Sequence, residues 1–495
     1  MKKVGFDSKK YRELTKEEIE KRIKKFDNKL YLEIGGKLFD DFHASRVLPG
    51  FKYNSKIEIL KDLKELTEII LCISARDIEK RKIRADYDIT YESDIMRLID
   101  KIREEEISVN SVVITLFENQ SSSIALKNKL ELNGIKVYTH TYTEGYPSDI
   151  DKIVSDEGYG ANEYIPTTKP LVVITAPGPG SGKLATALTL LYHDYKMGKK
   201  SGYAKFETFP VWDLPLKHPV NIAYEAATAD LKDLNMIDPF HLEHYNKTAV
   251  NYNRDIEVFP ILKTILKRIT NEDIYYSPTD MGINMIGSSI INEKNIITAS
   301  NDEIIRRYFK SLVETKKNNQ NIEVSDRIKV LMNELNLDVL ERKVVKYSHK
   351  KQEKKNSHAM AIELENGKII TGRTTDLMSA PASTIMNALK YLTKLDEDVH
   401  ILSPLLIEPI IKMKRELSQS KSDVLSLKEI LLALSISAAT NPIIDKMLEN
   451  LSKLKECEAH ATYILSHEEA LILKQLDINY TTDAIYANNN LFKDE

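Results

Sequence analysis

The sequence has only two cysteines, Cys72 and Cys457, and they lie far apart. This excludes a disulfide framework and a cysteine-rich zinc module, and it is typical of a reducing compartment. The longest apolar stretch, near residues 430–439, is far shorter than the ~20 residues that cross a bilayer. The first residues lead into charged helical sequence without an apolar signal region. We therefore expect a soluble, cytoplasmic protein that does not bind membranes.

The chain also lacks a strong charge of either sign. Its 71 basic and 74 acidic side chains give a formal net charge of −3, so no bulk electrostatic attraction to nucleic acid is expected. Hydrophobic residues make up 42% of the 495 residues, which is an ordinary balance for a globular protein. At ~150 residues per domain this length corresponds to about three domains, and it leaves room for homo-oligomers.

Buried strands alternate with helices in the first third of the chain. Apolar runs at residues 68–78, 111–119 and 135–142 predict strands, and segments 92–105 and 123–132 predict helices between them. This alternation favours an α/β fold with a mostly parallel sheet and right-handed crossovers.

Capping boxes and turn residues suggest further boundaries. Thr15 and Ser300, each followed three residues later by glutamate, predict the starts of two helices. Residues 202–300 are rich in turn-forming residues and predict long loops over the sheet, with helices inserted. The lysine-rich run 346–358 predicts a solvated linker or loop rather than a nucleic-acid patch.

The C-terminal part opens with a predicted hairpin whose turn contains Asn366-Gly367. A helix with Pro381 in its first turn follows, and two further strands close the region. We divide the chain into three parts. Residues 1–325 form an α/β region, and residues 326–357 form a helical connector with a basic linker. Residues 358–495 form a C-terminal α/β domain, in which residues 403–455 are a helical insertion.

A glycine-rich loop follows the apolar run 171–174 and precedes a helix. Its sequence, APGPGSGK, places Gly182 and Lys183 where a phosphate-binding loop has its Gly-Lys pair. Pro177 replaces the first glycine of that motif, and Leu184 replaces the hydroxyl residue that ligates magnesium. The loop therefore departs from the consensus of a nucleotide triphosphatase.

The remaining features of the loop still favour anion binding. Gly178, Gly180 and Gly182 allow close backbone approach, and Ser181 lies among them. The following helix presents free amides and a positive dipole end beside Lys183. We predict that these five residues bind a phosphorylated ligand; the alternative is a structural glycine turn with an exposed lysine.

Three further residues are candidates for catalysis or metal binding. Asp280 lies in the loop segment SPTDMG, where it would ligate a metal, act as a base or simply cap a turn. Asp238 precedes a predicted helix that contains His241 and His244, and it is a second candidate metal ligand. For the histidine pair, a helix cap with solvated histidines is the favoured interpretation. Arg254 would clamp a phosphate or pair locally with Asp255.

The charged segment near residue 40 and the two cysteines are also considered as site residues. The charges between Lys37 and Arg46 are dense, which fits either anion recognition or a surface loop. Cys72 is expected in the core. Cys457 and His460 have metal-like spacing but no second pair, so we interpret them as structural.

Six segments together carry a resemblance to a known bacterial family. GGKLFDDFHASRVLPGF, APGPGSGK, FETFPVWDLPLKHPVN, NMIDPFHLEHY, SPTDMG and TGRTTDLMSAPAS occur in this order, and the chain resembles uncharacterised protein family 0371 over nearly its whole length. The resemblance implies an α/β N-terminal region, a helical segment and a C-terminal domain similar in fold to the cytidine deaminases. It implies no particular activity.

The deaminase likeness does not extend to zinc chemistry. Such enzymes need an H-x-E motif together with P-C-x-x-C. His241-Leu242-Glu243 is an H-x-E outside the C-terminal region; His467-Glu468-Glu469 also fits that pattern, but the sequence has no C-x-x-C. At most the fold is shared.

The sequence thus predicts a protein that binds an anionic small molecule or nucleotide, with Mg²⁺ as an accompanying ion. Phosphoryl transfer is the reaction that a lysine, glycine amides and carboxylates support best. In that reaction Lys183, Asp280 and Arg254 would be the catalytic residues, and Asp238 and Asp280 would hold the metal. The alternative is a non-catalytic sensor or assembly protein.

Overall fold

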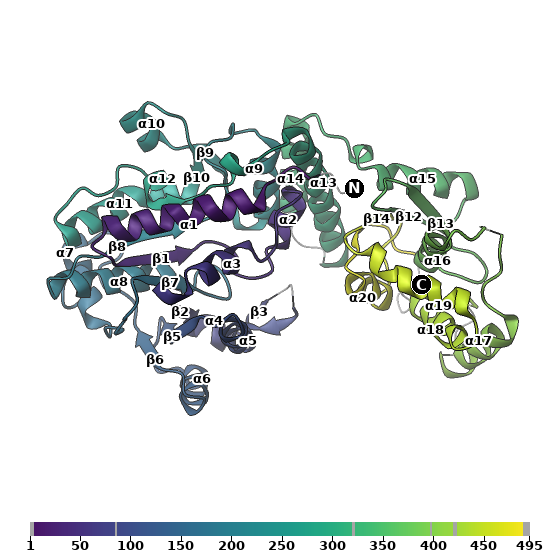
Figure 1. Cartoon of the computed structure of the whole chain (residues 1–495), viewed down its shortest axis with the longest axis horizontal. Helices are drawn as coiled ribbons and strands as arrows, with labels where there is room; N and C mark the ends of the chain where they lie inside the picture. The colour runs from purple at the N-terminus through teal and green to yellow at the C-terminus, as the bar shows by residue number, and fades with distance from the viewer. Residues whose placement is uncertain (1–3, 85–86, 319–321, 397, 419–422, 489–495) are drawn as a thin grey trace. The chain divides into compact units, whose positions relative to one another are not determined.

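The computed structural model describes residues 4–84, 87–318, 322–396, 398–418 and 423–488 (Figure 1). The chain forms two compact units. The N-terminal unit comprises Val4–Glu225 and Lys232–Ala299, and the C-terminal unit comprises Ala226–Leu231 and the chain from Ser300 onward.

The N-terminal unit is built on a sheet of seven parallel strands. In spatial order they are β11 (Gly282–Ile283), β8 (Gly202–Phe206), β1 (Leu30–Ile34), β7 (Leu171–Thr175), β2 (Thr67–Ser74), β5 (Ser108–Thr115) and β6 (Val137–His140). Every residue of β1, β2 and β7 is buried, which explains the continuous apolar runs in their sequences. The predicted parallel α/β sheet is confirmed.

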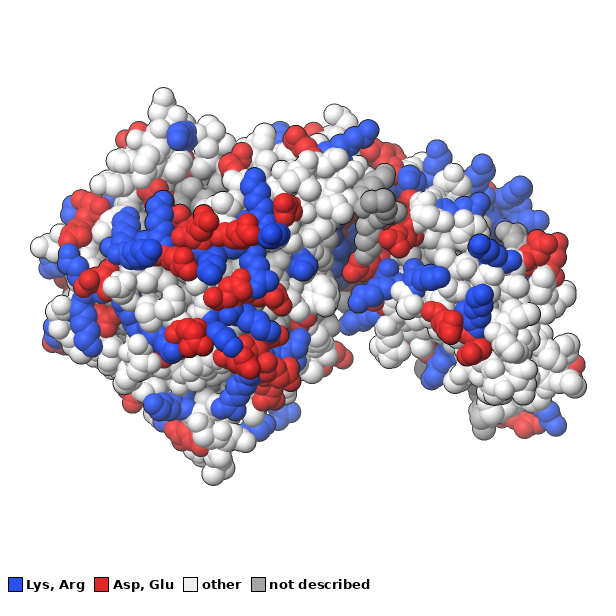
Figure 2. Space-filling model, viewed as in Figure 1, with Lys and Arg blue, Asp and Glu red and all other residues white. Residues whose placement is uncertain are grey.

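Helices flank this sheet (Figure 1). The longer ones are α1 (Ser8–Lys25), α3 (Ser55–Asp62), α5 (Tyr91–Glu104), α6 (Ser121–Leu132), α8 (Lys183–Lys196) and α11 (Asn253–Thr270). Shorter elements are α2 (Phe42–Val47), α4 (Ala75–Glu79), α7 (Ile150–Ile153), α10 (Pro239–Tyr245), α12 (Pro278–Met281) and the paired strands β9 (Asn235–Ile237) and β10 (Val250–Tyr252). Figure 2 shows basic and acidic side chains intermingled over α1, in keeping with the ion pairs along that helix.

The path of the chain reverses direction between β2 and β7. From β2 the chain proceeds outward to β5 and β6, whereas from β7 it crosses β1 to reach β8 on the other side. Ligands of open α/β sheets bind where neighbouring connections diverge in this way, outside the carboxyl ends of the strands. The glycine-rich loop follows β7 at that edge.

The C-terminal unit contains a four-stranded mixed sheet. Its order is β13 (Ile369–Arg373), β12 (Ala359–Glu363), β14 (Glu458–Ala461) and β15 (Asn479–Thr482), with only the last pair parallel. The predicted hairpin is confirmed, and Gly367 in its turn has a φ of +78°. The helices are α14 (Ile322–Glu334), α15 (Lys343–Lys355), α16 (Ala380–Thr393) and α20 (His467–Gln475), with α17 (Pro404–Ser418), α18 (Leu427–Ala438) and α19 (Pro442–Glu449) in the expected helical insertion.

Two predicted helix starts are wrong. Helix α1 begins at Ser8, capped by Asp7, and α13 (Glu293–Asn318) begins well before Ser300. Thr15 and Ser300 are fully buried inside their helices, so the capping-box pattern was accidental at both positions.

Two segments are more regular than the sequence suggested. Residues 202–300 were predicted to be long loops with inserted helices, and they include the 18-residue helix α11, which contains Pro260. The lysine-rich run is not a loop, because α15 covers most of it. Within the described residues, no helix combines the length and hydropathy of a membrane span.

Candidate functional site

The glycine-rich loop between β7 and α8 is tightly fixed. Gly180 and Gly182 have φ values of +73° and +80°, a region that favours glycine, and Gly182 is the N-cap of α8. The Thr115 hydroxyl donates to the carbonyl oxygen of Ser181 over 3.0 Å, and the Ser181 hydroxyl donates to that of Gly178 over 2.8 Å. These bonds hold the backbone in one conformation at the start of α8.

Lys183, the first residue of α8, directs its side chain toward a buried carboxylate. Its Nζ lies 3.9 Å from Oε1 of Glu33, and both side chains are mostly buried. Glu33 is the fourth residue of β1, and its other oxygen accepts a 2.8 Å hydrogen bond from the Tyr203 hydroxyl of β8. The lysine predicted from the loop motif is therefore placed at the carboxyl end of the central strands.

More charged side chains extend this arrangement. Lys205 is the register partner of Glu33 across β1 and β8. Its Nζ lies 2.8 Å from Oε1 of Glu207 and 2.7 Å from Oδ2 of Asp255, near the start of α11. We call the group that these residues form the carboxyl-edge cluster; it consists of Glu33, Lys183, Tyr203, Lys205, Glu207 and Asp255.

The cluster contains a carboxyl group that titrates near neutrality. Burial, reinforced by the negative charges of Asp255 and Glu33, raises the pKa of Glu207 to about 7 although Lys205 opposes the shift. Burial would lower the pKa of Lys205, but Asp255, Glu207 and Glu33 outweigh it and raise that pKa. Glu207 is thus suited to exchange a proton near pH 7 while Lys205 stays charged.

This raised pKa has a consequence for stability. With its pKa raised to about 7, Glu207 keeps its proton in the folded state up to about that pH, whereas a glutamate of the unfolded chain has the ordinary pKa of 4.5. Since the folded state then binds more protons, stability is expected to fall as the pH rises from about 4.5 to 7. Melting temperatures of wild type and Glu207→Gln across this range test it: the variant should lose this part of the pH dependence. Parallel curves for the two proteins would contradict the assignment.

The other predicted site residues have local partners. One carboxylate oxygen of Asp280 accepts from the backbone amides of Tyr276 and Ser277 in a capping box of α12. Asp238 is fully buried, caps α10, and also accepts hydrogen bonds from the amide and hydroxyl of Thr279. The structure thus brings the two aspartates to the same short helix, where both act as backbone caps.

Arg254 makes a two-point contact with a single carboxylate. Its Nε and Nη2 lie 2.7 and 2.9 Å from the two oxygens of Asp233. In the described part of the chain, no hydrogen bond or ion pair links Arg254, Asp238 or Asp280 to residues 178–183. Their catalytic and metal-binding roles remain predictions.

His241 and His244 each contact a neighbouring side chain, and Cys72 lies in the core. His241 contacts the Ser277 hydroxyl at 3.0 Å, whereas His244 stacks on Tyr276 at a centroid distance of 3.9 Å. Helix α10 begins at Pro239 with Asp238 as its cap, as expected, and His244 is exposed, whereas the His241 side chain is only 17% exposed and is not a solvated histidine. Cys72 is fully buried in β2.

The segment between Lys37 and Arg46 has structural roles as well. Asp41 caps α2 and lies 3.6 Å from the buried Nζ of Lys56, and Asp40 pairs with Lys101 at 2.9 Å. These contacts bind the segment to α3 and α5.

Five of the six members of the carboxyl-edge cluster, all except Lys183, were not predicted as site residues from the sequence. Glu33, Lys205 and Glu207 stand within or directly after buried strands, in the segments YLEI and YAKFE. A charge inside such an apolar strand is a signal that could have been used, because unpaired burial of a charge is costly. Asp255 had been considered only as a partner of Arg254.

The fold and the cluster define an α/β protein with a buried ionic site at the carboxyl edge of a parallel sheet. Residues 4–336 match the family model "Domain of unknown function DUF1846, N-terminal", and residues 340–492 match its C-terminal counterpart. The chain belongs to this family.

Curated relatives agree with this assignment. A UPF0371 protein of Clostridium tetani is 54% identical over 499 residues, covering 99% of both chains. UPF0371 proteins of Fusobacterium nucleatum and Clostridioides difficile are each 52% identical, over 503 and 499 residues, again with 99% coverage of both chains. The resemblance to uncharacterised protein family 0371 is thereby confirmed.

Proposed function

We propose that the N-terminal unit binds a phosphorylated small molecule, such as a nucleotide, at the carboxyl edge of its sheet. The observation that carries this proposal is the position of Lys183. It stands at the first turn of α8, after a loop with two left-handed glycines, and next to the switch in strand order. Backbone amides, a helix dipole and a lysine are the groups that bind phosphate oxygens.

The carboxyl-edge cluster would supply the chemistry. Glu207 would accept a proton from an attacking hydroxyl or water, since its pKa lies near 7. The Glu33 carboxylate, beside Lys183, is the group we expect to face a Mg²⁺ ion that accompanies phosphates. Phosphoryl transfer is the reaction we propose, because it depends on positioning and on charge neutralisation.

A non-catalytic sensor is the second candidate. Two observations favour it: Leu184 occupies the position of the magnesium-binding hydroxyl, and Lys183 already faces Glu33. In this case the phosphorylated ligand would compete with Glu33 for the lysine, and binding would occur without turnover.

We also propose a cytoplasmic location and a distant relationship of the C-terminal unit to the cytidine deaminase fold. Two free, buried cysteines support the location. A hairpin, the helix α16 and a final parallel strand pair support the fold relationship. The sequence has no zinc signature of those enzymes, so their reaction is not proposed.

Ligand-dependent thermal stabilisation tests the proposed site. The panel contains ATP, GTP, ADP, nucleoside monophosphates, NAD, phosphosugars and pyrophosphate, each with and without Mg²⁺. A ligand at a hundredfold its Kd stabilises the fold by about 2.7 kcal/mol. We expect a shift in wild type that is lost in Lys183→Ala.

The matched control is Lys196→Ala at the other end of the same helix. Lys196 is half-exposed and pairs with Asp156, so its removal should preserve the shift. Loss of the shift in both variants, or its absence in wild type across the panel, would overturn the proposal. For a ligand that does bind, a test of turnover would distinguish an enzyme from a non-catalytic sensor.

A further inference from the structure

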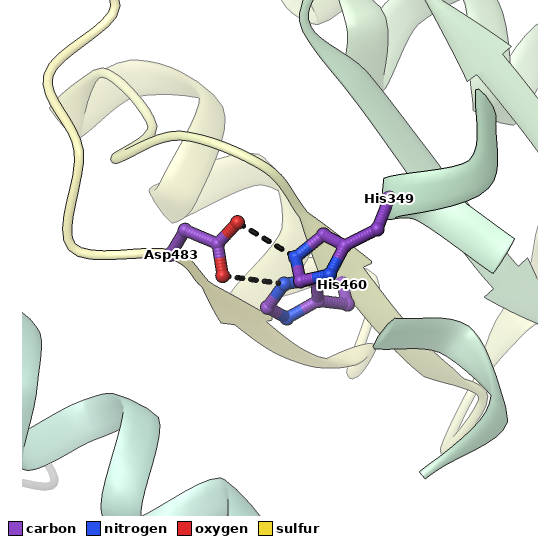
Figure 3. A group of neighbouring side chains, drawn as sticks. All are labelled: His349, His460 and Asp483. Atoms are coloured by element: carbon purple, nitrogen blue, oxygen red, sulfur yellow. Dashed lines mark hydrogen bonds and ion pairs between the residues drawn. The ribbon is translucent and has the colours of Figure 1, made fainter. Parts of the chain in front are cut away.

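Three potential metal ligands converge in the C-terminal unit, and one of them is His460, which the sequence alone led us to interpret as structural. His349 lies on α15, His460 on β14, and Asp483 directly follows β15 (Figure 3). One ligand atom of each residue lies within 4.8 Å of the others. The three side chains come from separate elements of one compact unit, so the fold itself brings them together.

The carboxylate of Asp483 is shared between the two imidazoles. Nε2 of His349 lies 2.8 Å from one oxygen, and Nε2 of His460 lies 3.2 Å from the other (Figure 3). His460 is fully buried and packs against the rings of Phe309 and His349. The His349 side chain is 31% exposed, so solvent reaches the cluster from that side.

The remaining nitrogen of His460 is held by Thr481, on β15. Nδ1 lies 2.8 Å from the Thr481 hydroxyl oxygen. The same hydroxyl accepts a hydrogen bond from Arg342 and has a second contact at 3.4 Å, with the carbonyl oxygen of Ala459. If the hydroxyl donates to that carbonyl, it accepts the proton of Nδ1. The Nε2 lone pair of His460 then faces the Asp483 carboxylate, an arrangement that a cation stabilises.

A hydrogen bond from the second ring nitrogen, such as the one from Nδ1 of His460 to Thr481, is characteristic of histidines that bind metals. A ligating histidine normally donates its second ring nitrogen to an acceptor, which fixes the tautomer and the orientation of the ring. The nearby positive charge of Arg342 is offset by Glu458, whose oxygen lies 2.6 Å from its Nη2. The site therefore does not face an uncompensated guanidinium.

We propose that His349, His460 and Asp483 form a binding site for a divalent transition-metal ion, for which Zn²⁺ is the best match. Ligands ~2.0–2.1 Å from a tetrahedral Zn²⁺ ion stand about 3.3 Å apart, close to the separations of Asp483 from the two imidazoles. Two imidazoles disfavour Mg²⁺ and Ca²⁺, which prefer oxygen. Three protein ligands leave a position open for water or substrate, on the side where His349 is exposed.

Metal binding by the full chain, made without a histidine tag, tests the proposal. After treatment with a chelator, the protein is titrated with Zn²⁺ by calorimetry and with Co²⁺ by visible absorption. We expect one tight site in wild type. His349→Ala should weaken it by more than the roughly 10–100-fold that loss of a second-shell partner costs. The variant should also lose the visible bands of bound Co²⁺.

His349→Ala is the primary variant because its partly exposed side chain can be removed with the least disturbance, and His460→Asn is the second. The matched control is His467→Ala, an exposed histidine of the same unit that lies outside the cluster. Circular dichroism without metal checks that each variant is folded. Equal Zn²⁺ affinity in wild type and folded His349→Ala, or no stoichiometric binding in wild type, would overturn the proposal. The cluster would then be a hydrogen-bonded triad in which Nε2–H of His460 donates to Asp483.

Discussion

Gly182→Ala is expected to destabilise the N-terminal unit by roughly 2–5 kcal/mol. A left-handed non-glycine residue costs about 1–2 kcal/mol. A Cβ atom at this position would also lie 2.7 Å from the Thr115 methyl group, and Thr115 is buried and β-branched. Overpacking of this kind adds about 1–3 kcal/mol. Chemical denaturation, followed by circular dichroism, measures the loss.

Gly180→Ala separates the backbone cost of a left-handed alanine from the steric cost of a Cβ atom against Thr115. Gly180 has a similar φ of +73°, but nothing lies within 4 Å of the position of its Cβ. We therefore expect only the backbone cost of about 1–2 kcal/mol. Equal losses in the two variants would show that Thr115 does not pack against the loop as described. That result would also remove the argument that the loop is held in one conformation.

Lys205→Met is expected to cost roughly 3–5 kcal/mol of unfolding free energy at pH 8. The substitution leaves Glu207 and Asp255 without their shared cation, and breaking a buried ion pair from one side has a cost of this size. The loss should shrink toward pH 5, because Glu207 takes up a proton there and no longer presents an unpaired charge. Denaturation curves at the two pH values give both numbers.

A double variant identifies the source of this loss. Lys205→Met combined with Glu207→Gln should recover part of the stability at pH 8, since one uncompensated charge has been removed. Lys200→Met serves as the matched control, because Lys200 is exposed and contacts Glu272 at the surface. A pH-independent loss in Lys205→Met, with no recovery in the double variant, would mean that lost packing rather than charge is responsible.

Much of the N-terminal sheet could be predicted because its strands are buried on both faces. The stretches IILCI of β2, VVI of β5 and LVVI of β7 are continuously apolar, and the helices between the strands have regular periodicity. Strand β1 was missed because Glu33 interrupts it and two glycines follow. The long helix α11 was missed because Pro260, normally a helix breaker, lies inside it.

The sites were harder to predict than the fold. Lys183 could be found because the loop motif is local in sequence. Its ionic partners come from β1, β8 and α11, and only strand order, which single-sequence patterns do not specify, brings them together. The same holds for His349 and His460: His349 lies on a helix that was predicted as a linker or loop, and His460 lies on a strand of the C-terminal sheet.

The position of β1 in the sheet determines how long this strand stays unpaired while the chain is being synthesised. Both of its neighbours, β7 and β8, come from much later in the sequence; Leu30 pairs with Leu171 and Gly202. At ~5–20 residues per second, β1 waits on the order of ten seconds or more on the ribosome before a partner strand emerges. Throughout that interval the strand, with Leu30, Leu32 and Ile34 on one face, is unpaired, and exposed apolar strand edges of this kind recruit chaperones. The N-terminal unit is thus completed late, after most of its sequence has been translated.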